Sequence, residues 1–244
     1  MFHRFDIATA NDLDTLLGTW IAVRIKRKGI VYDSHEYFTE VPELQHRPRI
    51  KNMWLHIEKR IFPKINRCIT VCESIAKIYE QLYNVPVAVV RNLPMSRDFK
   101  PIVTKVEMQD FATEKIILYQ GAVNLGRGLE LMIEAMQYVD NAKLIIVGSG
   151  DIIESIKLLA DSLRVSQKVL FVGKISSNEL PNYTRLATIG ISLEEDMGLN
   201  YRYALPNKLF DYIQAEKPVL VSDLPEMKKI VQHAFIILVL LFMY

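Results

Sequence analysis

The 244-residue sequence contains only two cysteines, Cys68 and Cys72, which stand four positions apart. No histidine or further cysteine accompanies them, so we expect no zinc site and interpret both as reduced thiols packed in a core. The chain has no apolar run of 18 or more residues, and its opening segment, MFHRFDIATA, lacks the apolar stretch of a secretory signal peptide. These absences predict a cytoplasmic protein.

The C-terminal segment AFIILVLLFMY is the longest purely apolar feature, yet it is too short to cross a bilayer. Three interpretations stay open for it: a buried strand, an interfacial anchor, or the product of a truncated reading frame.

Charge is unevenly distributed along the chain. The first 100 residues hold 16 Lys and Arg against 11 Asp and Glu, whereas the remaining residues hold 14 against 17. This asymmetry suggests a polarised surface that meets an anionic membrane or an anionic acceptor, although a solvated face explains any single cluster, such as Arg24 to Lys28, more simply. A basic amphipathic helix predicted over residues 48–62 likewise fits packing better than membrane contact. We expect no nucleic-acid partner.

Apolar strands alternate with amphipathic helices through both halves of the chain, which predicts an α/β fold with parallel sheets. The expected strands are residues 5–10, 29–33, 68–72, 85–90, 115–120, 143–147, 169–172, 189–193 and 218–221. The expected helices between them include 11–28, 75–83 with Ser74 as its cap, 129–139, 152–163, and helices starting near 178 and 206. Two domains follow, 1–100 and 101–244, with a charged linker over 95–114.

The segment from Thr188 to Asp223 carries the strongest chemical signal. It predicts a strand, an acidic loop, a helix whose first turn holds Asn207 and Lys208 after Pro206, and a second strand. Four-residue spacing puts Asp211 on the face of Asn207, while Leu209, Phe210 and Ile213 turn toward the sheet. A polar face with a lysine at a helix N-terminus suits phosphate, and a carboxylate suits sugar hydroxyls. The simpler alternative is a surface ion pair between Lys208 and Asp211.

The run GLNYRYALPNKLFDYIQAEKPVLVSDLPEM, residues 198–227, resembles the donor-binding segment of retaining glycosyltransferases of family 4. These enzymes have the GT-B fold of two facing Rossmann-like domains, and they carry a Glu, seven residues and a second Glu before a Gly-x-Pro-Val strand. Asp211 takes the place of the second Glu, and the first is Glu194 or Glu195 across a longer loop.

The resemblance also implies roles for residues elsewhere in the chain. In the loop GAVNLGRG, Gly121 and Arg127 would approach the pyrophosphate, and Lys208 would replace the missing charge at Ala122. The backbone at Lys174 and Ile175 would read the base, and Asn207, Lys208 and Asp211 would complete the donor site. In YDSHEYFTEVPEL, His35 would face the donor sugar, with Asp12 on the acceptor side.

By this resemblance the protein transfers a sugar from a UDP- or GDP-linked donor to a carbohydrate or lipid-linked acceptor, in polysaccharide or glycolipid synthesis, and locates in the cytoplasm or peripherally at the inner membrane face. No metal or other cofactor is expected, and the sequence has no Asp-x-Asp pair near a strand end. The resemblance covers about two thirds of a GT-B fold, with an incomplete N-terminal and a shortened C-terminal domain. An inactive fragment that binds a nucleotide sugar or pairs with another subunit is therefore the alternative, and a Rossmann-type dehydrogenase is disfavoured because neither glycine-rich turn is a dinucleotide fingerprint.

Overall fold

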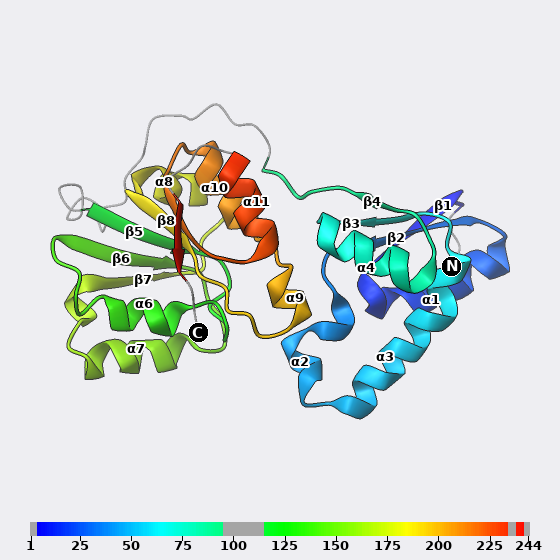
Figure 1. The fold of residues 1–244 in the computed structure, drawn as a ribbon, viewed down its shortest axis with the longest axis horizontal. Helices are drawn as coiled ribbons and strands as arrows, with labels where there is room; N and C mark the ends of the chain where they lie inside the picture. The colour runs from blue at the N-terminus through cyan, green and yellow to red at the C-terminus, as the bar shows by residue number, and fades with distance from the viewer. Residues whose placement is uncertain (1–3, 95–114, 234–237, 242–244) are drawn as a thin grey trace. The chain divides into compact units, whose positions relative to one another are not determined.

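The computed structural model describes residues 4–94, 115–233 and 238–241, and it divides the chain into two compact α/β units (Figure 1). Unit 1 comprises residues 1–92 together with 196–205, and unit 2 comprises 93–195 together with 206–244. The predicted linker, 95–114, lies outside the described residues. Short-range alternation of strands and helices thus produces two separate parallel sheets, as the sequence predicted.

Unit 1 is built on a four-stranded parallel sheet of order β1-β2-β3-β4. Its strands are β1 (Ile7–Asn11), β2 (Gly29–Ser34), β3 (Cys68–Thr70) and β4 (Val87–Val89). Its helical segments are α1 (Asp12–Lys26), η1 (Phe38–Glu40), α2 (Pro42–Gln45), α3 (Pro48–Ile61), η2 (Phe62–Lys64), α4 (Glu73–Tyr83) and α9 (Leu199–Arg202). Each of the first three strands is followed by a crossover to its parallel neighbour, the connection that a parallel ladder requires.

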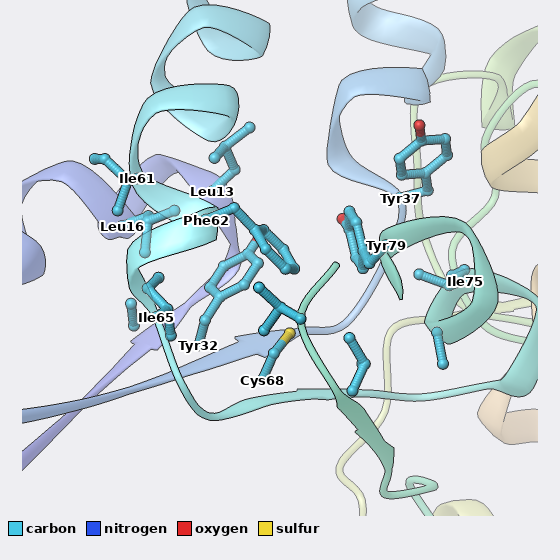
Figure 2. Close-up of a cluster of buried hydrophobic side chains, with 14 of the residues drawn as sticks. Leu13, Leu16, Tyr32, Tyr37, Ile61, Phe62, Ile65, Cys68, Ile75 and Tyr79 are labelled. Carbon is cyan, nitrogen blue, oxygen red and sulfur yellow. The ribbon is translucent and has the colours of Figure 1, made fainter. Parts of the chain in front are cut away.

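Aromatic side chains fill the core of unit 1 (Figure 2). Phe62 meets Tyr32 edge to face at 5.5 Å between ring centroids and lies 4.8 Å from Tyr79. Both cysteines are free and buried, as expected. Cys72, not Ser74, is the residue that precedes helix α4, because the helix begins at Glu73, two residues earlier than predicted.

Unit 2 is built on a six-stranded parallel sheet of order β10-β9-β8-β5-β6-β7. Its strands are β5 (Lys115–Gln120), β6 (Ala142–Val147), β7 (Val169–Gly173), β8 (Ile189–Ser192), β9 (Val219–Ser222) and β10 (Leu238–Leu241). Its helical segments are α6 (Leu129–Ala135), α7 (Ile153–Ser162), η3 (Ser166–Lys168), α8 (Leu180–Leu186), α10 (Asn207–Gln214) and α11 (Pro225–His233). Figure 1 shows α6 and α7 on one side of this sheet and α8, α10 and α11 on the other, the layering of a doubly wound fold.

Two details of unit 2 differ from or refine the sequence prediction. Helix α6 ends at Ala135, so the predicted helix over 129–139 is four residues too long. Met136 N–H donates to the carbonyl oxygens of both Met132 and Ile133, a shared bond typical of a closing helical turn. Part of the C-terminal apolar run forms β10 beside β9, which favours the strand interpretation of that run.

Helix α3 has basic residues along it and two exposed apolar side chains, Ile50 at 40% and Met53 at 49% exposure. Its last turns pack inward, where Ile61 joins the core of unit 1. Packing therefore accounts for only part of its apolar face. Throughout the described ranges, no helix combines the length and the apolar character needed to cross a bilayer.

Candidate functional site

The candidate site lies at the carboxyl edge of the unit 2 sheet. The chain enters this sheet at β5, adds β6 and β7 on one side, and then returns to add β8, β9 and β10 on the other. The strand order therefore reverses between β5 and β8, and the loops after these two strands diverge at that point. In open α/β sheets such a switch point is the usual position of a ligand crevice.

Helix α10 is fixed to this edge by Tyr212. The ring is fully buried, and its hydroxyl donates to the carbonyl oxygen of Leu118 at 3.0 Å. Gly190 of β8 makes room for the ring, because a Cβ there would lie about 2.5 Å from its atoms. Lys208 stands four residues before Tyr212 and so projects from the same face of α10 toward the sheet.

Lys208 is consequently buried, with 8% of its side chain exposed. Its Nζ lies 2.8 Å from Glu194 Oε1 and 4.1 Å from the centroid of the Tyr119 ring. The expectation that Lys208 lies on a polar helix face open to a ligand is wrong, and so is the alternative of a surface pair with Asp211. The reason is Tyr212, whose burial turns this face of the helix inward.

Glu194 is the centre of a compact charge cluster. Its side chain is completely buried, the Ser192 hydroxyl donates to Oε2 at 2.7 Å, and Arg127 Nη1 lies 3.6 Å from Oε1. Two cations therefore surround one carboxylate. The cluster Arg127–Glu194–Lys208 carries a formal charge of about +1 in an environment where water is largely excluded.

The pKa values of the buried pair respond to burial and to each other. Burial alone would raise the pKa of Glu194, but the Lys208 ammonium, the Ser192 hydroxyl and Arg127 together hold this pKa below its usual range. Burial lowers the pKa of Lys208, against the opposing effect of Glu194 and with a further small contribution from Arg127. An anion that binds beside Lys208 and Arg127 would add negative charge there and so favour the protonated form of Lys208.

The loop that carries Arg127 is held against the end of β8. Glu195 N–H donates to the carbonyl oxygen of Gly126 at 2.9 Å. Gly128 has a left-handed φ of 68°, and a Cβ there would lie 2.2 Å from the carbonyl oxygen of Leu193. Only glycine allows this approach. Glu195 is partly exposed, and burial followed by the charge of nearby Glu130 raises its pKa.

Asp211 connects helix α10 to the end of β5. Its Oδ2 accepts a hydrogen bond from Gln120 Nε2 at 2.8 Å, and Gln120 Oε1 accepts one from the Thr184 hydroxyl at 2.8 Å. Both Gln120 and Thr184 are buried. The amide thus orients the carboxylate, since its two polar ends are both committed. Asn207, one turn before Asp211, is exposed.

A cavity of about 420 Å³ opens beside this network at the ends of β5, β6 and β7. Three predicted donor-binding residues, Gly121, Lys174 and Ile175, line it. Gly121 directly follows Gln120, so the cavity adjoins the Asp211 network along the chain. The volume lies within the range of small-molecule sites.

In unit 1, His35 follows β2 and Asp12 follows β1 at the carboxyl edge of the other sheet. His35 N–H donates to Asp12 Oδ1 at 2.8 Å, and His35 Nε2 lies 3.2 Å from Asp33 Oδ2. The imidazole is 43% exposed. Burial raises the pKa of Asp12, while the hydrogen bond and the charge of His35 oppose that rise. The structure therefore brings the predicted pair together and adds Asp33.

The predicted residues thus form three groups. Unit 2 holds the charge cluster and, as a second group, the cavity together with Asp211. Unit 1 holds the His35 group. Sequence reasoning missed Gln120, Ser192 and Tyr212. A weak signal existed for the first two, since each is a polar residue at the end of an apolar strand. Among the described residues, no three His, Cys, Asp or Glu side chains gather as metal ligands would.

Comparisons with known proteins identify relatives of this chain in sequence and in fold. The family described as "Glycosyl transferases group 1" matches residues 104–239. An uncharacterized glycosyltransferase of Methanocaldococcus jannaschii, MJ1607, is 30% identical over 125 residues, which are 49% of this chain and 30% of that protein.

Solved structures share the fold at low sequence identity. Anabaena Alr3699/HepE, in a complex with UDP-glucose, aligns with a TM-score of 0.77 and 15% identity over 96% of this chain and 65% of its own. Sucrose-phosphate synthase from Thermosynechococcus elongatus aligns with a TM-score of 0.71 and 17% identity, over 93% of this chain and 58% of its own. WaaG, a glycosyltransferase involved in lipopolysaccharide biosynthesis, aligns with a TM-score of 0.67 and 15% identity, over 91% of this chain and 67% of its own. These alignments confirm the α/β GT-B class. The chain spans 30% of its curated relative and 62–65% of HepE.

Proposed function

Because the chain belongs to the glycosyl transferases group 1 family, we propose that it transfers a sugar from a nucleotide diphosphate sugar to an acceptor hydroxyl, with retention at the anomeric carbon. In this reaction the bond between the anomeric carbon and the diphosphate oxygen breaks, and a bond from the acceptor oxygen to that carbon forms. The acceptor hydroxyl proton leaves with the diphosphate or passes to solvent. The central catalytic task is to stabilise the negative charge that develops on the leaving diphosphate.

The observation that carries this proposal is the position of the charge cluster. Arg127, Glu194 and Lys208 meet at the switch point of the unit 2 sheet. Tyr119 links this cluster to the cavity, because its ring lies 4.1 Å from Lys208 Nζ and its hydroxyl donates to the carbonyl oxygen of Ala122, which lines the cavity. A diphosphate at this edge would gain charge-assisted hydrogen bonds from Arg127 in a region of low dielectric. The buried Lys208 ammonium adds positive charge to this edge. Its side chain needs no rearrangement when the diphosphate binds, because Glu194 and Tyr119 already hold it in place.

The two acidic residues after β8 then divide their tasks. Glu194 is buried and occupied by Lys208, Arg127 and Ser192, so we propose that it positions the cations. Glu195 is partly exposed in the same loop, and we propose that it faces the donor sugar. The raised pKa of Glu195 suits a group that shares a proton with sugar hydroxyls.

The remaining donor contacts follow from the cavity and the Asp211 network. We propose that the base lies against Lys174 and Ile175 and that the ribose hydroxyls bond to Asp211, which Gln120 holds in place. Asn207 is exposed at the start of α10, and we propose that it contacts the same ligand. HepE has been crystallised with UDP and with UDP-glucose, so a UDP-linked donor is the first to test, followed by a GDP-linked one.

On unit 1, we propose that His35 contacts the donor sugar and that Asp12 belongs to the acceptor side. Asp12 and Asp33 flank the imidazole and limit its orientation. The acceptor class that we propose is a carbohydrate or a lipid-linked carbohydrate of a polysaccharide or glycolipid route. Two cations and a helix start would supply the charge that a metal ion supplies elsewhere, so we propose metal-independent transfer without a cofactor.

The experiment has two stages. Thermal stabilisation by UDP-, GDP- and ADP-sugars identifies the donor, because a ligand of the native state raises the melting temperature by mass action. Radiolabelled donor is then incubated with candidate acceptors, and transfer and hydrolysis are measured. Stabilisation followed by transfer supports the proposal. Binding without turnover would favour the alternative of a catalytically incomplete fragment that binds a nucleotide sugar. No stabilisation by any nucleotide sugar would reject both of these and favour a chain that only pairs with another subunit.

A further inference from the structure

Unit 1 has a second cavity, at the amino ends of its strands and thus at the sheet edge opposite His35. Its volume is about 450 Å³, and Ile7 of β1 and Gly29 of β2 line it. Four cations share this lining: Arg24, Lys28, Lys64 and Arg67. They come from the end of α1, the turn before β2 and the segment that leads from η2 into β3, so folding brings them together from three places in the chain.

The tryptophan in this cavity holds two of the cations. Arg24 Cζ lies 5.7 Å and Lys64 Nζ lies 5.4 Å from the centroid of the Trp20 ring. Cation–π contacts of this length keep both charged groups near the cavity wall instead of letting them extend into solvent. Trp20 is itself partly buried against the core of unit 1, so the aromatic anchor is fixed.

Few carboxylates lie near these four cations. Lys28 pairs with Asp6 at 2.8 Å. In residues 4–94 and 196–205, no carboxylate lies within ion-pair distance of Arg24, Lys64 or Arg67. Residues at the end of a helix can offset the helix dipole, which accounts for Arg24 in the last turn of α1. The helix dipole does not account for Arg67, which lies directly before strand β3.

We infer that this cavity binds a phosphate-bearing anion, in addition to and independently of the donor site in unit 2. Three uncompensated cations around a concavity lower the free energy of an anion within it, and arginine presents paired donors that match phosphate oxygens. The phosphate belongs either to a free phosphorylated compound or to the headgroup of an anionic lipid. The two sources share the same chemistry at this cavity and differ in the experiment.

The test uses Trp20 as a local reporter. The chain has two tryptophans, so Trp54→Phe leaves Trp20 alone, and Trp54 contacts Phe38 edge to face, a contact that phenylalanine can preserve. Trp20 emission is then titrated with pyrophosphate at constant ionic strength, and with vesicles of phosphatidylcholine with or without phosphatidylglycerol. Trp20 lines the unit 1 cavity, so its emission reports directly on pyrophosphate bound there.

Two charge-matched variants decide the outcome. The double variant Lys64→Ala/Arg67→Ala removes two cavity cations, and Lys59→Ala/Arg60→Ala removes two exposed cations from the end of α3. We expect saturable binding that weakens at least about tenfold in the first variant and less than about twofold in the second. Response to pyrophosphate alone identifies a free phosphate compound. Response to phosphatidylglycerol vesicles that pyrophosphate reverses identifies a headgroup. The inference is overturned if neither ligand alters Trp20 emission, or if both variants lose affinity equally.

Discussion

Glu58, on helix α3 of unit 1, makes the stability of this unit depend on pH. The side chain is fully buried, the Tyr83 hydroxyl hydrogen-bonds to Oε1, and Oε2 has no partner among the described residues. Burial is the main cause that raises the pKa of Glu58 from 4.5 to about 7, although the Tyr83 hydrogen bond lowers it. The carboxyl therefore holds a proton in the folded unit under conditions where it ionises in the unfolded chain.

The sign and the size of the effect follow from linkage. Because the folded pKa is the higher one, the folded state binds the proton more tightly. The stabilising contribution is fully present below pH 4.5 and is lost as pH rises through 7. One pKa unit corresponds to about 1.4 kcal/mol, so wild-type unit 1 loses about 2 to 3 kcal/mol between pH 5 and pH 8.

Glu58→Gln removes this titration and keeps an oxygen acceptor for Tyr83. The measurement is urea unfolding followed by tryptophan fluorescence at several pH values, and both tryptophans, Trp20 and Trp54, belong to unit 1. We expect the free energy of unfolding of Glu58→Gln to rise relative to wild type by about 2 to 3 kcal/mol from pH 5 to pH 8. Glu43→Gln, at an exposed glutamate of α2, is the control and should track wild type. Parallel pH profiles for wild type and Glu58→Gln would refute the reasoning.

Three further predictions concern unit 2. Gly128→Ala should destabilise the unit by about 1–3 kcal/mol and abolish nucleotide binding, because the new Cβ would clash with the Leu193 carbonyl oxygen. A melting curve measures the loss of stability, and a UDP titration measures the loss of binding. Lys208→Met should cost about 3–5 kcal/mol, because it removes the cation nearest to the buried Glu194 carboxylate. Adding Glu194→Gln should restore most of that loss in chemical unfolding followed by circular dichroism, and an uncorrected loss in the double variant would contradict the pairing. Tyr212→Phe should cost about 1 kcal/mol in the same assay, because it removes a buried hydroxyl that donates to the Leu118 and Ile191 carbonyl oxygens. An unchanged stability would argue against these contacts.

Much of the fold could be predicted because the relevant signals are local. Apolar strands, amphipathic helices and short turns alternate in both units, and parallel pairing follows from that alternation. The grouping of His35 with Asp12 was predictable for the same reason. Each residue directly follows a strand, and neighbouring parallel strands end at one edge of the sheet.

The details that could not be predicted depend on contacts between distant segments. The inward direction of Lys208 depends on Tyr212, and the burial of Tyr212 depends on space left by Gly190, which is 22 positions away. The sequence shows each residue but not their contact, and the apolar residues of the helix alone do not indicate that Lys208 faces inward. Gln120 is similar, because only the fold shows that its amide meets Asp211 and Thr184.

The assignment of the short segment after Glu195 shows the same limit. Residues 196–205 follow a strand of unit 2 yet belong to unit 1. There, the Asn200 side chain accepts a hydrogen bond from Tyr37 N–H at 3.0 Å, and Cys72 Sγ lies 3.4 Å from the Tyr203 carbonyl oxygen. Chain order places this segment in the second domain, and only its tertiary contacts assign it to the first.

The central claim is that the charge cluster of unit 2 holds the diphosphate of the donor. The most direct measurement compares the affinities of UDP and uridine, or of the corresponding pair for the base that stabilises the protein best, in wild type, Arg127→Ala and Lys208→Ala. Lys157→Ala, on the exposed face of α7, is the control. We expect each cluster variant to weaken nucleoside diphosphate binding by at least about tenfold, with nucleoside binding changed less than about twofold. Equal losses for the nucleoside and its diphosphate would contradict the claim.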